Sequence, residues 1–239
     1  MKNILISIRP EWCEKILNGE KTIEVRKTFP NCKLPAKVYI YCSKGKNKLF
    51  VPYEINCFNE DETSKAYIAE EPILENVDYL ANGKVIAEFK LNVGYGIPCQ
   101  ALINNDDDHY HYKTITQVVE KSSCLTYNEL KEYANGKTLY FWQILSLKIY
   151  DKPKELKDFM VTDEEKIKKC PYRSRVFYKN SNNGIIPTSY ACDCCNKEDS
   201  CQINWCNKCL VKPLEKAPQS WCYVKENKDE RAKGIKIYL

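Results

Sequence analysis

The stretch "SIRPEWCEKILNGEKTIEVRK", residues 7 to 27, decides the fold. Pro10 occupies a favourable first position of a helix, and Asn18-Gly19 is a typical C-terminal stop. Before the helix, residues 3–9 alternate isoleucines with other residues, as a strand does. After it, "TIEVRK" restores the period of two. The segment therefore predicts a strand, a short helix and a second strand.

The second strand carries its charges on one face. Alternation places Glu24 and Arg26 on one side of the strand, whereas Ile23 and Val25 project from the other. A solvated strand face with a cross-strand ion pair explains this pattern. A ligand-binding cleft that also includes Lys21 is the alternative explanation. Lysine and arginine can bind a phosphate or an oxyanion, and glutamate can accept a hydrogen bond from an exocyclic amine.

Further strands are predicted where β-branched and aromatic residues are concentrated between turn signals. These are residues 37–43, 84–91 and 138–150. Strands therefore dominate the first ninety residues. Residues 44–82 are polar and acidic with little period, which indicates an insertion at the edge of the sheet.

Two further helices are predicted from their capping boxes. Thr126 and Glu129 form a T-x-x-E box that begins a helix ending near residue 134. Thr162 and Glu165 form a second box, in a segment bounded by two prolines. The second box predicts a helix between residues 153 and 171.

Composition excludes several classes of protein. Hydrophobic residues make up 44% of the 239 residues and charged residues 29%, which is typical of globular proteins. No apolar run is long enough to cross a membrane, and the N-terminus lacks the pattern of a signal peptide, so we expect a cytoplasmic protein. The net charge of +5 is compatible with a nucleic-acid partner but too small to demonstrate one.

Cysteine spacing gives the strongest chemical signal. Composition changes beyond Cys170, so a boundary near residue 160 separates residues 1–160 from an extension, 161–239. In a reducing compartment, two C-x2-C knuckles separated by ten residues predict a closed structural Zn²⁺ site that supports folding. The expected ligands are Cys192, Cys195, Cys206 and Cys209, with Cys194, Cys201 and Cys222 as alternates. An iron–sulfur cluster and reduced or redox-active thiols stay open as alternatives.

The pattern around the second strand resembles the ASCH domain, a family with a PUA-like β-barrel. The family hallmark G-x-K-x-x-E-x-R is matched by Gly19, Lys21, Glu24 and Arg26. Other segments agree in order: "KVYIYCS", "GKVIAEF", "CLTYNELKEY", "YFWQILSLKIYDKPKEL" and "APQSWCYV". The chain is similar to longer ASCH proteins carried by phages and other mobile elements of bacteria.

This resemblance implies an α+β fold. Residues 1–160 would form a PUA-like pseudobarrel with flanking helices, interrupted by the insertion at about 44–82. The extension, 161–239, would contain a helix and the cysteine-rich, zinc-bound segment, and would fold back so that "QSWCYV" packs on the barrel.

The resemblance also implies a cleft that recognises single-stranded RNA or a modified nucleobase or nucleoside. The ligand-binding residues would be Lys21, Glu24, Arg26 and Arg9. An aromatic side chain would stack on the base. The candidates are Tyr41, Tyr140 and Trp142.

Two other functions stay open. Some small members of the family remove an acyl group from the exocyclic amine of cytidine, using a lysine, a threonine and a glutamate. Lys21 matches the lysine, but Glu24 occupies the position three residues later, so the carboxylate would come from Glu24 or Glu88. The third function is a protein interaction between phage and host, with a host protein bound by the insertion at 44–82.

Overall fold

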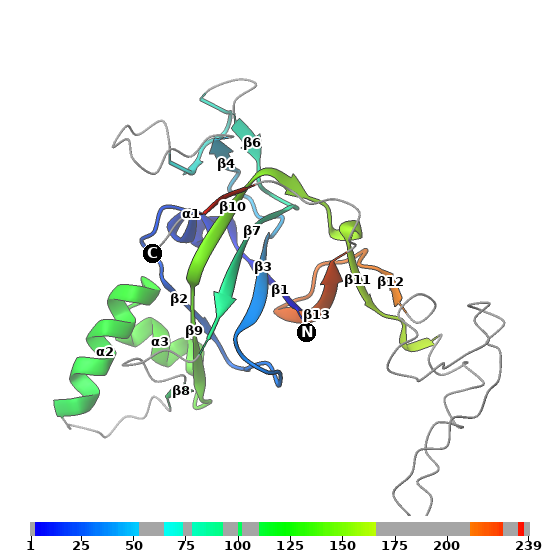
Figure 1. Ribbon diagram of the computed structural model, residues 1–239. Coiled ribbons are helices and arrows are strands. Elements are labelled where there is room, and N and C mark those ends of the chain that lie inside the picture. The colour runs from blue at the N-terminus through cyan, green and yellow to red at the C-terminus, as the bar shows by residue number, and fades with distance from the viewer. Residues whose placement is uncertain are drawn as a thin grey trace, which may run out of the picture.

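The computed structural model describes residues 3–52, 65–73, 78–92, 100–101, 110–165, 211–226 and 234–236. Its helices are α1 (Pro10–Leu17), α2 (Tyr110–Ser123) and α3 (Tyr127–Ala134), with a short 3₁₀ helix η2 (Leu156–Asp158). Its strands are β1 (Asn3–Ile8), β2 (Ile23–Arg26), β3 (Ala36–Cys42), β4 (Leu49–Pro52), β5 (Tyr67–Ile68), β6 (Asp78–Leu80), β7 (Val85–Leu91), β8 (Gln100–Ala101), β9 (Leu139–Gln143), β10 (Leu145–Lys154), β11 (Phe159–Thr162), β12 (Val211–Pro213), β13 (Trp221–Glu226) and β14 (Gly234–Lys236). Figure 1 shows a mixed α+β arrangement.

An eight-stranded sheet forms the centre of the fold, in the order β12-β11-β13-β1-β3-β7-β10-β14. Within it, β1 pairs in parallel with β3 and antiparallel with β13. Parallel neighbours need a crossover connection, and α1 followed by β2 supplies it. β13 lies beside the first strand although it is far away in the sequence (Figure 1).

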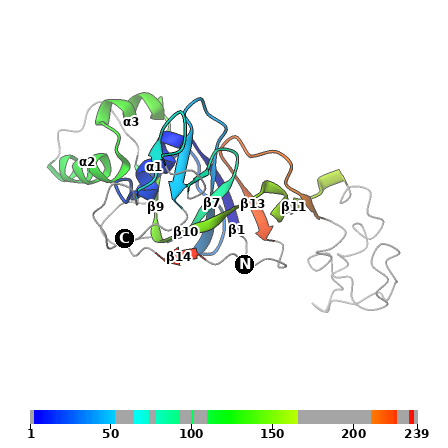
Figure 2. The same cartoon turned by 90° about the horizontal axis from the view of Figure 1, so that it is seen from above.

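Three clusters of buried side chains hold the elements together. The first core cluster lies between one face of the large sheet, α1 and Trp142 of β9. The second core cluster, with Tyr39 of β3 and Phe159 of β11, covers the opposite face. The third joins α2 and α3 to the small sheet β2-β9-β8 and contains Ile23 and Val25. Figure 2 shows α2 and α3 together on the far side of the molecule from β11 and β13.

The local predictions for residues 7–27 are confirmed. α1 begins at Pro10, and Gly19 adopts the positive φ of 77° that favours glycine after a helix. Ile23 and Val25 pack in the third core cluster, so Glu24 and Arg26 project from the opposite face of β2. The capping box at the start of α3 is confirmed as well.

The expected barrel is not closed among the described residues. The large sheet ends in β12 on one side and β14 on the other, and the small sheets are separate. The chain moves from the small sheet to the large one at Ile144, between β9 and β10. Ser146 has a φ of 51° close to this corner, where the register between β10 and β7 shifts. The continuous run 138–150 therefore bends between two sheets, which is a known way to form a corner. The predicted α+β class is confirmed, and the described residues form open sheets rather than a closed barrel.

Two other segments differ from their sequence patterns. Between residues 153 and 165, the chain contains η2 and β11, and a helix begins only at residue 164, so the predicted helix does not extend back to Pro153. Residues 166–171 lie outside the described residues. Inside 44–82, the described part forms β4, β5 and β6, which pair with one another as a second small sheet. Among the helices described, none is long and apolar enough to span a membrane.

Candidate functional site

Lys21 is almost completely buried, with 2% of its surface exposed. Its backbone N–H donates to the carbonyl of Lys15, which ties the residue to the end of α1. Its Nζ donates to the carbonyl of Ser123 at 2.8 Å, at the C-terminus of α2, where the helix dipole favours a cation. The ring centroid of Trp12 lies 5.1 Å from Nζ, which is within range of a cation–π interaction.

Glu24 lies between two cations. Its Oε2 is 3.5 Å from Nζ of Lys21, and its Oε1 is 2.9 Å from Nε of Arg26. The side chains of Glu24 and Arg26 are 9% and 13% exposed, so water screens these pairs weakly. The three residues form a buried network that we call the charge triad. Such a network is expensive to desolvate.

Arg26 connects three strands. Its Nη2 donates to the carbonyl of Ser7 at 2.6 Å, and its Nη1 donates to Oγ of Ser220 at 3.3 Å, just before β13. Its Nε is buried and makes no well-aligned hydrogen bond, although Glu24 Oε1 is close enough for charge attraction. Oγ of Ser123 is also buried without a hydrogen-bond partner. Two unsatisfied polar atoms therefore belong to residues that contact the Lys21–Glu24 pair directly.

The pKa of Lys21 is lowered from its usual value of 10.5. Burial is the main cause, and the Arg26 charge acts in the same direction. The Glu24 carboxylate opposes both effects. The lysine therefore loses its proton more readily than a surface lysine does, which is the property required of a lysine that acts as a base.

Lys21 should make stability depend on pH. Because its pKa is lower in the folded chain than in the unfolded chain, the unfolded chain binds more protons between the two values. The free energy of unfolding should therefore rise with pH through that window, by up to about 1.4 kcal/mol per pH unit. Urea unfolding as a function of pH should show this rise in the wild type, and Lys21→Met should lack it.

Several tyrosines act in the opposite sense at high pH, and Tyr39 and Tyr150 have the largest shifts. Burial raises the pKa of both Tyr39 and Tyr150, so their contribution to stability is lost as pH rises above the usual tyrosine value. These tyrosines are unchanged in Lys21→Met. Subtracting the variant's plot of unfolding free energy against pH from that of the wild type therefore removes their contribution. If the free energy of unfolding depended on pH in the same way in the wild type and in Lys21→Met, the pKa of Lys21 would not be lowered in the folded chain.

Glu88 is not part of the charge triad. It lies on β7, where it accepts hydrogen bonds from Lys37 Nζ at 3.0 Å and from the Tyr150 hydroxyl at 2.7 Å. Tyr150 belongs to the second core cluster, on the face of the large sheet opposite the first. The structure therefore does not bring Glu88 together with Lys21 and Glu24.

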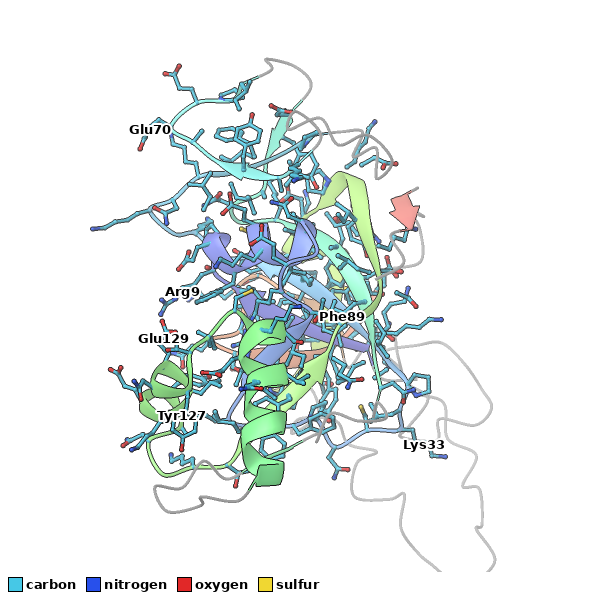
Figure 3. The ribbon with its side chains drawn as sticks, turned by 90° about the vertical axis from the view of Figure 1, so that its left-hand side faces the viewer. Arg9, Lys33, Glu70, Phe89, Tyr127 and Glu129 are labelled. Atoms are coloured by element: carbon cyan, nitrogen blue, oxygen red, sulfur yellow. The ribbon has the colours of Figure 1, made fainter. Side chains whose placement is uncertain are left out.

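Of the other predicted residues, Arg9 is exposed and Tyr41 is buried in the core. Trp142 and Tyr140 are the β9 partners of Glu24 and Arg26 in the β2–β9 ladder. Arg9 follows β1 directly, its side chain is 77% exposed, and Figure 3 shows it on the same side of the molecule as α3. Trp142 is fully buried in the first core cluster, and Tyr41 is 4% exposed in the second. Tyr140 is half-buried and packs 5.9 Å from the ring of Phe29. Neither Trp142 nor Tyr41 offers an accessible face to a ligand.

Comparisons with known proteins give only distant matches. No protein-family model and no curated protein sequence matches the chain. Solved structures that resemble it include three from Zymomonas mobilis. These neighbours are ASCH proteins.

The crystal structure of ASCH from Zymomonas mobilis is 16% identical, with a TM-score of 0.38 over 75% of this chain and 84% of that chain. A ZmASCH variant with a tyrosine-to-phenylalanine change is 16% identical, with a TM-score of 0.39 over 76% of this chain and 87% of that chain. A serine-to-alanine variant is 18% identical, with a TM-score of 0.38 over 65% of this chain and 75% of that chain. Similarity at this level carries no argument about ligand or activity.

Sequence reasoning missed several residues around the ASCH-like motif. Trp12 contacts Lys21 from α1, Ser123 accepts from it at the end of α2, and Ser7 and Ser220 hold Arg26. Ser220 is 194 positions from Arg26, so no local pattern could pair them. Trp12 offered a signal, because it lies nine residues before Lys21 in the same conspicuous segment.

The predicted zinc ligands Cys192, Cys194, Cys195, Cys201, Cys206 and Cys209 lie outside the described residues. Cys222 is described, in β13, where it packs at the edge of the second core cluster and burial raises the pKa of its thiol to about 11. Within the described ranges, no group of three or more histidine, cysteine, aspartate or glutamate residues could hold a metal ion. The zinc site therefore stays a prediction from sequence.

Proposed function

We propose that the chain binds a nucleobase at the charge triad, either in a modified nucleoside or in single-stranded RNA. The observation that carries this proposal is the position of Glu24, which is buried between Lys21 and Arg26 while Arg26 Nε lacks a well-aligned hydrogen bond. A buried polar atom without a partner calls for an explanation, and an absent ligand is one such explanation. The G-x-K-x-x-E-x-R spacing supports the same reading.

The chemistry of the charge triad fits the edge of a base. A carboxylate is the usual acceptor for the exocyclic amine of cytosine, and arginine and lysine are the usual donors to carbonyl and ring-nitrogen acceptors. Two carboxylate oxygens offer about four acceptor positions, so Glu24 can contact its two cations and still accept from a ligand. Cytosine presents a donor beside an acceptor, which matches a glutamate beside an arginine.

Glu24→Gln should weaken this binding strongly. The change keeps the shape of the side chain but removes the charge that accepts from the amine, and hydrogen bonds to charged groups contribute about 1.5–3 kcal/mol. We therefore expect a loss of about 10- to 100-fold in affinity. Calorimetric titration of the full chain with cytidine, acetylated cytidine, uridine and a single-stranded RNA oligomer would measure it.

Glu88→Gln is the matched control. Glu88 is also a partly buried glutamate with a lysine partner, but it lies on the opposite face of the large sheet. Glu88→Gln should leave the affinity for these probes unchanged. Equal effects of the two substitutions, or no binding of any of these probes by the wild type, would overturn the proposal.

A second function, hydrolysis of the acyl group from acylated cytidine, is favoured by the lowered pKa of Lys21. A neutral Lys21 would take a proton from water as the water adds to the acyl carbon, and Arg26 would stabilise the resulting oxyanion. The C–N bond then breaks as Lys21 gives its proton to the departing amine nitrogen, and cytidine and a carboxylic acid are released. Mass spectrometry of the same samples separates the functions, because release of cytidine by the wild type but not by Lys21→Met requires catalysis.

A further inference from the structure

Asn18 joins the insertion to the end of α1. Its Nδ2 donates to the carbonyl of Ala66 at 2.8 Å, and its Oδ1 accepts from the backbone N–H of the same residue at 3.0 Å. Ala66 lies directly before β5, and only 2% of its surface is exposed. The amide of Asn18 therefore satisfies both backbone groups of a buried residue, which would be costly to leave without partners.

The small sheet β5-β4-β6, which we call the insertion sheet, also packs against α1. Leu49 and Val51 of β4 belong to the first core cluster together with Ile16 of the helix. The carboxylate of Glu14 accepts a hydrogen bond from the backbone of Ile68 in β5. The helix is therefore held on one side by the large sheet and on another by the insertion sheet.

The end of α1 sets the position of Lys21. Gly19 turns the chain with a φ of 77°, and the backbone N–H of Lys21 then donates back to the carbonyl of Lys15 at 3.0 Å. Trp12 of the same helix places its ring 5.1 Å from the lysine Nζ. Because Asn18 is the last residue before this turn, a shift of Asn18 would move Lys21 within the charge triad.

A second asparagine makes a similar pair of hydrogen bonds inside the insertion. The Oδ1 of Asn82 accepts from the backbone N–H of Leu49 at 2.8 Å, and its Nδ2 donates to the carbonyl of Asn47 at 2.8 Å. Both of these partners belong to the insertion, whereas the bonds of Asn18 connect the insertion to the helix. Comparing the two asparagines therefore separates the folding of the insertion from its attachment to α1.

We propose that Asn18 is a positioning residue, through which the insertion keeps Lys21 buried beside Glu24. The insertion then supports the charge triad from outside it, because detaching Ala66 from Asn18 would release the turn that carries the lysine. This inference goes beyond the proposed function, since it concerns the position of Lys21 with or without a ligand. It also gives the insertion a role that its polar, acidic sequence did not indicate.

The test measures how fast Lys21 reacts with an acetylating reagent in the folded full chain, without ligand. The acetylation of a buried amine follows local opening of the structure, and digestion followed by mass spectrometry identifies the modified lysine. The loss of two hydrogen bonds should make this opening easier, so Asn18→Ala should raise the acetylation rate at Lys21 by about 5- to 150-fold. Asn82→Ala removes two similar bonds and should leave this rate close to that of the wild type.

The pKa of Lys21, followed by NMR of its side chain, gives a second readout. Burial is the main cause that lowers this pKa, so greater exposure in Asn18→Ala should move it upward, toward the usual value of 10.5. The charged or titratable groups that face Nζ are Glu24, Arg26 and Cys124, and the substitutions leave them in place. A purely structural role of Asn18 would lower the free energy of unfolding without changing this pKa.

Asn18→Asp provides a second variant of nearly the same size as the wild type. It places a negative charge against the carbonyl of Ala66 and should also raise the acetylation rate at Lys21. An unchanged acetylation rate in both variants of Asn18, an unchanged pKa in Asn18→Ala, or equal acetylation rates in Asn18→Ala and Asn82→Ala would overturn the inference. Because both readouts are taken without ligand, a failure to bind any nucleobase would overturn only the proposed function.

Discussion

Glu24→Ala is expected to lower the free energy of unfolding by about 3–5 kcal/mol, because it leaves two buried cations without their shared carboxylate. Lys21 is 2% exposed and the side chain of Arg26 is 13% exposed, so water cannot replace the missing charge without opening the structure. Urea unfolding at neutral pH measures the change. The loss is a large part of the 5–15 kcal/mol that typically stabilises a domain.

Two further variants show whether the effect comes from unpaired charge. Lys21→Met combined with Glu24→Ala removes one of the stranded cations, and should recover about 0.5–3 kcal/mol relative to Glu24→Ala alone. Glu11→Ala removes an exposed carboxylate 3.8 Å from Arg9, and should change stability by less than about 0.5 kcal/mol. If Glu24→Ala behaved like Glu11→Ala, the charge triad would not be the buried, coupled network that its distances indicate.

Trp142→Ala is expected to cost about 3–5 kcal/mol, the usual penalty for removing a fully buried indole. The ring is fully buried in the first core cluster, 5.8 Å from Phe29 and 5.9 Å from Trp221, and its Nε1 donates to the carbonyl of Thr28. Chemical denaturation followed by circular dichroism would measure the loss. Trp142→Phe should cost less, because it leaves a smaller cavity.

Tyr133→Ala is the informative control for this substitution. Both changes remove a large aromatic residue, but Tyr133 is 41% exposed and should cost only about 1 kcal/mol. Trp142→Ala should therefore reduce stability far more than Tyr133→Ala does. A Trp142→Ala protein as stable as Tyr133→Ala would show that the indole is not the buried core residue that the first core cluster indicates.

The parts of the fold that could be predicted from the sequence are those set by residues close to one another in the sequence. The alternation in β2 and the capping box of α3 are patterns within a few positions, and the structure contains both. The alternation even assigned the correct faces, since Ile23 and Val25 pack under the helices. Period two determines which side chains share a face, and one buried face is enough to fix the other.

The errors have a common physical origin. Whether an aromatic residue such as Trp142 is a platform or a core residue depends on which sheet covers it, and a strand pattern contains no such information. Likewise, the run 138–150 gave no sign that it would change sheets at Ile144. The contacts that complete the charge triad come from distant segments, since Ser123 lies 102 positions from Lys21 and Ser220 lies 194 from Arg26.

During synthesis, a ribosome releases β1 long before β13. Until residues 221–226 emerge, one edge of β1 carries unpaired backbone groups, and Leu5 lacks its cover from Val224 in the second core cluster. Open edges of this kind invite pairing with other chains, and contacts between distant segments form slowly. The nascent chain is therefore exposed to aggregation for most of its translation, and premature termination before Trp221 would leave a product that chaperones and proteases must remove.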